Sequence, residues 1–180
     1  MTQHLIKELI NAIGDDPGRP GLVDTPARVV KSWDALFSGY REAPGEILSA
    51  TFPADGYDEI VILKDIEFFS TCEHHLMPFS GVAHVAYLPD KRLVGVSKLA
   101  RLVECFARRL QIQERIARSV VDAFCYHIRP KGAAIKIEAE HHCIACRGVG
   151  KSSASMVTVA TSGVFRDGAD RAEFLGMVAR

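Results

Sequence analysis

The sequence predicts one α+β domain whose strands pair antiparallel. The chain has 180 residues and is 48% hydrophobic, which is enough for a single well-buried core. Its apolar residues follow a helical period in some segments and alternate in others. The predicted elements run as helices, a hairpin, two helices, a second hairpin and a final helix. This order differs from the strict strand–helix alternation of parallel α/β folds.

The N-terminal segment is predicted to contain two helices. Apolar residues recur at helical spacing from Leu5 to Ile13, and a turn-rich stretch covers residues 14–24. A second helix should then begin with Asp24 or Thr25 as its N-cap, because Pro26 suits the first helical turn.

The remaining elements follow from alternation, apolar stripes and breakers. Strands are expected over residues 61–70, 81–88, 133–140 and 154–165. Helices are expected from residue 97, with Ser97 as N-cap, from about 113 to 127, and from 170 onward. The strands fall into two sequential pairs, which predicts two hairpins.

Composition excludes several classes of protein. Lys+Arg and Asp+Glu both count 22, so no basic excess suggests a nucleic-acid groove or an anionic membrane surface. No apolar run approaches the roughly 20 residues of a membrane span, and the N-terminus does not resemble a secretory signal. We therefore expect a cytoplasmic protein. Its five cysteines then suggest metal binding or core packing, not disulfides.

Two short motifs carry most of the chemistry, Cys72-Glu73-His74-His75 and the segment from His141 to Val149. Cys72 and His75 are spaced like half of a zinc site, and Cys143 offers a thiolate from a distant segment. Cys146 is a possible fourth ligand. Four ligands would indicate a structural zinc site, whereas three would leave a position for water, as catalytic sites do.

Spacing alone favours a closed Cys3His site, but it does not decide between the two kinds of site. Two considerations favour an open site. The chain has ample apolar residues and needs no metal to fold, and spare imidazoles beside the ligands are useful only to a site that moves protons. A weaker third argument is that, if the strand continues through Cys143, then Cys143 and Cys146 lie on opposite faces.

Together the motifs strongly resemble the GTP cyclohydrolase I family, over about Thr25 to Val178. Besides the two motifs above, the matching stretches are Thr25-Pro26-Ala27-Arg28-Val29 with Lys31, the segment Gly95–Arg101, and Gln111-Ile112-Gln113-Glu114-Arg115. The resemblance implies a hydrolase that converts GTP and water to formate and 7,8-dihydroneopterin triphosphate, the first step of tetrahydrofolate and pterin biosynthesis. It also implies the tunnelling fold, an antiparallel four-stranded sheet with helices on one side, which assembles into a ring as a homodecamer with active sites shared between subunits.

The resemblance also implies roles for individual residues. Zinc would be held by Cys72, His75 and Cys143, and the catalytic imidazoles would be His74 and His141. Glu114 would accept hydrogen bonds from guanine. The other substrate-binding residues would be Gln113, Ser97, Lys98, Arg101 and Arg147 of one subunit and Arg28 and Lys31 of its neighbour.

The implied domain organisation is an N-terminal helical region, residues 1–50, followed by a zinc-dependent catalytic domain, residues 51–180. Two other hypotheses remain: a non-catalytic protein stapled by zinc on the same fold, and another pterin- or purine-handling enzyme with a different outcome. Glu114, Lys98, Arg101 and Arg147 favour the GTP hydrolase, because a structural zinc site has no use for groups that bind guanine and triphosphate.

Overall fold

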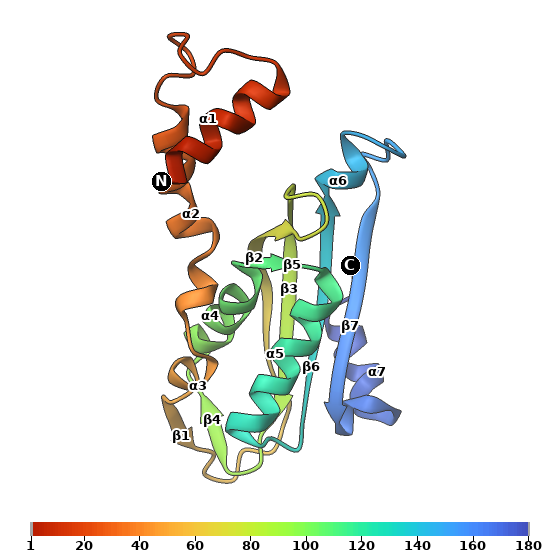
Figure 1. Ribbon diagram of the computed structural model, residues 1–180. Helices are drawn as coiled ribbons and strands as arrows, with labels where there is room; N and C mark the ends of the chain where they lie inside the picture. Colours follow the sequence, from red (N-terminus) through yellow and green to blue (C-terminus); the bar gives the residue numbers. More distant parts are fainter. Residues whose placement is uncertain (1, 180) are drawn as a thin grey trace. The chain divides into compact units, whose positions relative to one another are not determined.

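The computed structural model describes residues 2–179 and contains two compact units, one up to Ser38 and one from Gly39 (Figure 1). The second unit thus begins before residue 51, the expected start of the catalytic domain. The segment after Ser38 belongs to it because hydrogen bonds join this segment to the rest of the unit. The Gly39 amide donates to the Arg108 carbonyl at 3.1 Å, and Cys105 Sγ lies 3.7 Å from the Glu42 carbonyl oxygen. A short 3-10 helix, Ser38–Arg41, and the short helix α3, Pro44–Ile47, lie in this segment.

The first unit consists of the two predicted helices, α1 (Thr2–Ile13) and α2 (Thr25–Leu36). Ile6 and Ile10 are the buried residues of α1, one turn apart on the predicted apolar stripe. α2 has a proline in its first turn, as expected. Asp24 stands at the N-cap without capping a backbone amide, and its carboxylate instead accepts a hydrogen bond from Arg28 Nη2 at 3.0 Å.

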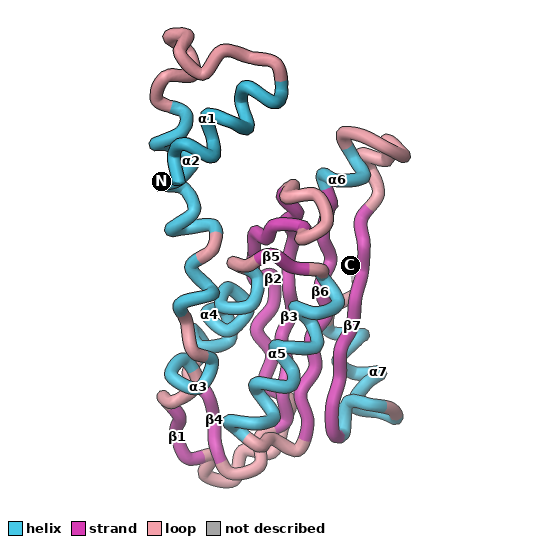
Figure 2. Tube along the Cα trace, viewed as in Figure 1, coloured by secondary structure: helices cyan, strands magenta, loops and turns pink. Residues whose placement is uncertain are grey.

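A mixed β-sheet forms the centre of the second unit, with the spatial order β5-β2-β3-β6-β7 (Figure 1 and Figure 2). Its strands are β2 (Val61–Cys72), β3 (Pro78–Leu88), β5 (Leu110–Gln111), β6 (Gly132–His141) and β7 (Ser155–Gly163). Both predicted hairpins are present, because β2 pairs with β3 and β6 with β7, each antiparallel. An antiparallel pairing of β3 with β6 joins the hairpins into one sheet.

The sheet has one strand more than the expected four-stranded antiparallel sheet. β5 is two residues long and pairs parallel with β2, through Thr71 with Leu110 and Cys72 with Gln111. A strand this short produces no alternating pattern, so the sequence does not indicate it. A separate two-stranded sheet pairs β1 (Thr51–Pro53) with β4 (Arg92–Val94), each three residues long.

Two helices cover one face of the sheet, α4 (Val96–Ala107) and α5 (Gln113–Ile128) (Figure 1). The main core lies between them and the sheet, and its large side chains include Phe68, Leu102 and Phe124. The predicted N-cap role of Ser97 is wrong. Gly95 precedes α4, and Ser97 lies exposed within its first turn.

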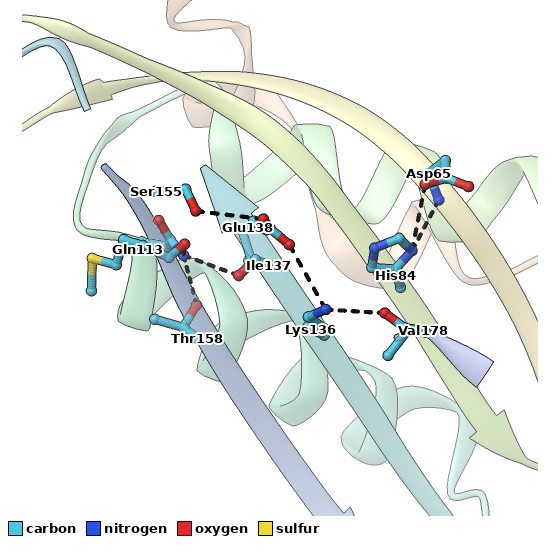
Figure 3. A network of polar contacts seen from close by, with 10 residues as sticks. Asp65, His84, Gln113, Lys136, Ile137, Glu138, Ser155, Thr158 and Val178 are labelled. Atoms are coloured by element: carbon cyan, nitrogen blue, oxygen red, sulfur yellow. Dashed lines mark hydrogen bonds and ion pairs between the residues drawn. The ribbon is translucent and has the colours of Figure 1, made fainter. Parts of the chain in front are cut away.

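A third helix, α7 (Gly168–Met177), corrects the expectation that all helices lie on one side. Phe174 of α7 packs with Ala86 of β3 and Ala134 of β6, whereas the neighbouring Val85 and Ile135 belong to the main core. Successive strand residues point to opposite faces, so α7 covers part of the second face. Figure 3 shows Lys136 on that face, where its Nζ donates to the Val178 carbonyl at 3.0 Å.

No helix among residues 2–179 is both long and apolar enough to cross a membrane.

Candidate metal centre and active site

Three predicted metal ligands converge at one end of the sheet. The ligand atoms of Cys72, His75 and Cys143 all lie within 4.8 Å of one another. Cys72 is the last residue of β2, and a tight turn follows in which the Leu76 amide donates to the Cys72 carbonyl at 2.9 Å. This turn brings His75 back over Cys72, so that Cys72 Sγ and His75 Nδ1 are 3.8 Å apart.

Cys143 reaches the same place because β6 runs beside β3. The register pairs His141 with Phe79, next to the turn that carries His75. The chain then forms the one-turn helix α6, His142–Ala145, so the condition of the weaker argument, a strand continuing through Cys143, is not met. The helical turn buries Cys143 and leaves Cys146 exposed. Cys146 Sγ contacts the His142 carbonyl at 3.0 Å, and Cys146 is not a member of the ligand group.

The geometry of this group fits a small tetrahedral ion. Two ligand atoms at about 2.3 Å (sulfur) and 2.1 Å (nitrogen) from a tetrahedral zinc lie roughly 3.6 Å apart, close to the 3.8 Å between Cys72 and His75. Burial raises the pKa of the Cys143 thiol, and the adjacent Cys72 raises it further, while Arg147 opposes the shift. A cation bound between the two sulfurs would instead favour the deprotonated thiolate of Cys143, because metal binding deprotonates thiols.

A bidentate ion pair braces the turn that carries these ligands. Glu73 lies between Cys72 and the histidines, and both of its carboxylate oxygens accept from the Arg115 guanidinium, one of them at 3.1 Å. The Glu73 amide also donates to the Gln111 carbonyl at 3.0 Å. Hydrogen bonding to Arg115 lowers the pKa of Glu73. The start of α5 therefore holds the turn that carries Cys72 and His75 through a charge-assisted contact.

The two predicted catalytic histidines have contrasting surroundings. The His74 side chain is 63% exposed, and its Nε2 lies 3.9 Å from a Glu73 oxygen. His141 is half-buried and stacks on Phe79, with ring centroids 4.5 Å apart and planes 7° from parallel. Burial lowers the pKa of His141, and the charge of Glu114 opposes this shift. The ring of His141 is thus held in place, while that of His74 is open to solvent.

The predicted substrate-binding residues lie in separate parts of the second unit. Glu114 is exposed at the start of α5 and lines a groove of about 430 Å³ with residues 158–161 of β7. Lys98 and Arg101 line another groove, of about 400 Å³, together with Arg41 of the 3-10 helix and three glutamates, Glu42, Glu46 and Glu104.

The remaining residues predicted to bind substrate line neither of these two grooves. Arg147 and Ser97 are exposed, and Arg147 is near enough to affect the Cys143 thiol. Gln113 differs from them, because it is only 1% exposed and its amide is hydrogen-bonded within the protein. Arg28 and Lys31 are exposed on α2 of the first unit.

Sequence reasoning missed two features of the site. The first is the Glu73–Arg115 pair, although both residues lie in the motifs that were singled out. A charged residue between two ligands was a usable signal, but its partner is 42 positions away. The second is the link between Gln113 and His141, 28 positions apart, for which periodicity offers no signal.

Comparison with known proteins matches residues 2–179 to the family model of GTP cyclohydrolase I. The chain is 51% identical over 177 residues to GTP cyclohydrolase 1 of Wolinella succinogenes, covering 98% of this chain and 95% of that protein. It is 48% identical over 167 residues to GTP cyclohydrolase 1 of Brucella canis, covering 92% and 78% respectively. Among solved structures, the apo form of an archaeosine synthase QueF-Like aligns with a TM-score of 0.47 at 18% identity, over 58% of this chain and 93% of that one.

Proposed function

This chain belongs to the GTP cyclohydrolase I family, and on that premise we propose that it hydrolyses GTP to formate and 7,8-dihydroneopterin triphosphate. It thereby acts on the cyclic amidine of guanine and begins pterin and tetrahydrofolate biosynthesis. The observation that carries this assignment to the site is the convergence of Cys72, His75 and Cys143 beside His74 and His141. Family membership favours this enzyme over a binding protein that uses zinc only as a staple.

The metal of the proposed site is zinc. Two thiolates and one imidazole form a set that zinc prefers, and a site with three protein ligands is of the catalytic type. Zinc bound there would act as a Lewis acid and bring the pKa of water toward neutrality. The protein's own part is to hold the three ligands, which it does through the β2–β3 turn, α6 and the Glu73–Arg115 pair.

Recognition of GTP divides between its base and its phosphates. Glu114 is proposed to accept hydrogen bonds from N1–H and the exocyclic amine of guanine, a donor pair that adenine lacks. Lys98, Arg101 and Arg147 are proposed to bind the triphosphate, with Ser97 near the ribose and phosphates. Lys98 and Arg101 line one groove with Arg41, where Glu42, Glu46 and Glu104 balance their charge, so the family pattern and not a net positive charge supports this part of the proposal.

His74 and His141 are proposed to carry the protons of the reaction. Water adds to C8 of guanine, the C8–N9 bond opens as a proton moves to nitrogen, and a second hydrolysis releases formate. The ribose then opens, rearranges and closes onto the base with loss of water. Imidazoles titrate near neutral pH and suit these steps. The position of His141 beside the ligand group, with its ring stacked on Phe79, supports such a role.

The active unit is proposed to be a cytoplasmic homodecameric ring with sites shared between subunits. Glu114 and the pair Lys98 and Arg101 line different grooves of one chain. Arg28 and Lys31 would then reach a neighbour's triphosphate. Strand β7 is an edge of the sheet, and ring closure pairs such edges.

Incubation of the zinc-loaded protein with GTP tests the proposed function directly. We expect stoichiometric release of formate, together with a product that becomes fluorescent as a pterin after oxidation. ATP in place of GTP is the matched control and should yield neither product. Absence of formate from a fully zinc-loaded preparation would contradict the assignment.

A further inference from the structure

Gln113 is a buried amide at the first position of α5, and all of its polar atoms have protein partners. Its Nε2 donates to the Ile137 carbonyl at 3.2 Å, the Met156 carbonyl at 2.9 Å and Thr158 Oγ1 at 3.1 Å. Figure 3 shows this amide pointing between β6 and β7. Its Oε1 lies 2.8 Å from His141 Nε2. The side chain thus connects the two strands to the imidazole of His141.

These partners determine which way the amide points. Backbone carbonyls only accept hydrogen bonds, so the end of the amide that faces the Ile137 and Met156 carbonyls must be the NH2 group. The opposite orientation would place three oxygens together in a buried site, which is costly. The amide oxygen of Gln113 therefore faces His141 and can only accept.

An acceptor at 2.8 Å requires a proton on His141 Nε2. Parallel stacking on Phe79 opposes rotation of the ring. Among the described residues, no protein group is hydrogen-bonded to the other nitrogen, Nδ1. The neutral imidazole thus has a committed donor at Nε2 and an available lone pair at Nδ1.

We propose that Gln113 is a positioning residue that fixes the ring of His141 through the hydrogen bond from Nε2–H to Gln113 Oε1, so that Nδ1 is the ring nitrogen left to face the substrate. This inference rests on the proposed function, in which His141 carries protons. Gln113 then acts through His141, in place of the substrate contact that the family resemblance suggested, and its 1% exposure leaves little of the amide for a ligand.

The tautomer of His141 can be measured in the wild-type, zinc-loaded protein. Solid-state 15N NMR of protein labelled with [15Nδ1]-histidine at pH 8.5 separates protonated from unprotonated ring nitrogens whatever the size of the assembly. The His141 resonance is the one missing from a His141→Asn sample. We expect an unprotonated Nδ1, and a protonated Nδ1 would overturn the proposal. Because wild-type turnover of GTP is assayed on the same sample, failure of the proposed function is detected separately.

Substitution of Gln113 tests whether the contact matters for turnover. Gln113→Leu should lower kcat by roughly 10–100-fold, by analogy with outer partners that orient metal-bound histidines, while KM for GTP and zinc content stay near wild type. Gln113→Glu keeps an acceptor for His141 and, as the protonated carboxyl, a single donor for the Ile137 or Met156 carbonyl, so it should recover part of kcat. A raised KM with unchanged kcat would instead identify a substrate contact and overturn the positioning role.

Ser162→Ala is the control, because Ser162 is also a buried polar residue, and its Oγ is hydrogen-bonded to the backbone of Ala133 without contacting His141 or the ligand-bearing turn. It should leave the His141 resonance and kcat close to wild type. An equal loss of kcat in Gln113→Leu and Ser162→Ala would show a general effect of losing buried hydrogen bonds and would contradict the proposal. If Gln113→Leu does not fold, the tautomer of the wild-type protein still decides the question.

Discussion

Cys143 and Cys146 lie three residues apart, but only Cys143 joins Cys72 and His75. We predict that Cys143→Ser abolishes stoichiometric zinc binding and turnover, because one of three ligands is lost. Cys146→Ser should retain both, since Cys146 is exposed and outside the ligand group. Metal analysis and X-ray absorption spectroscopy provide the measurement. A first shell with three sulfur atoms would show that Cys146 is a ligand and that the site is structural.

The two histidines should behave differently from the ligands beside them. We predict that His74→Ala and His141→Ala each retain zinc and bind GTP, while turnover falls by roughly 10²–10⁴-fold, the usual contribution of acid–base catalysis. His75→Ala is the contrasting variant and should lose the metal. Should the His74 variant lose its zinc while the His75 variant keeps it, the roles of these two neighbours are exchanged.

Glu114 should determine the preference for guanine. A carboxylate that accepts two hydrogen bonds from GTP accepts only one from ITP, which lacks the exocyclic amine. Hydrogen bonds to charged groups contribute about 1.5–3 kcal/mol, so Glu114→Ala should reduce the ratio of GTP to ITP turnover by roughly 10–100-fold. Zinc content serves as the control and should not change. A ratio equal to that of the wild type would remove Glu114 from the guanine site.

At the scale of elements, the Glu73–Arg115 pair joins the start of α5 to the β2–β3 turn that carries two candidate ligands. We predict that Arg115→Ala accelerates zinc loss and weakens zinc affinity by roughly 10–100-fold, the usual effect of removing an outer partner. Arg118→Ala is the matched control, because Arg118 is on the same helix but pairs with Asp122. Competition with a chromogenic chelator measures both. Equal affinities for the two variants would mean that the ion pair does not support the turn.

The pH range of this support follows from the pKa shift of Glu73, which its hydrogen bond to Arg115 lowers. A carboxyl with a lowered folded-state pKa stabilises the fold above its unfolded pKa, about 4.3, and this contribution disappears as the pH falls through the folded value. The Glu73–Arg115 pair should therefore support the turn at neutral pH and lose this contribution only in acid, which unfolding measured as a function of pH would show.

At the scale of the whole molecule, the proposed sharing of sites predicts complementation between inactive subunits. An Arg28→Ala/Lys31→Ala variant and a His141→Ala variant should each be inactive alone. After exchange of subunits, some boundaries will carry both intact halves, and GTP turnover should reappear. Mass spectrometry of the mixture is the control for exchange. Mixed oligomers without activity would show that these cations serve their own chain's site or bind no phosphate.

Local patterns in the sequence were sufficient to predict the main helices and strands of the second unit. Alternation predicted β6 and β7 as a hairpin, and apolar stripes predicted α4 and α5, because such patterns reflect the face that each element buries. Elements of two to four residues, such as β5 and α6, were missed since they span less than one period of any pattern. The second-face position of α7 was missed too, because it depends on alanines of β3 and β6 that leave room for Phe174.

By itself, the sequence determined the order of the elements and four metal-ligand candidates, because motif spacing and periodicity are properties of the chain alone, and its motifs carried the resemblance to the family. Only the tertiary structure decided that Cys146 stays outside the ligand group, that Arg115 braces Glu73, and that Gln113 orients His141. Each of these depends on strand register or on a helical turn that brings distant residues to hydrogen-bonding distance. Direction and distance between such residues arise from packing, and no local pattern encodes them.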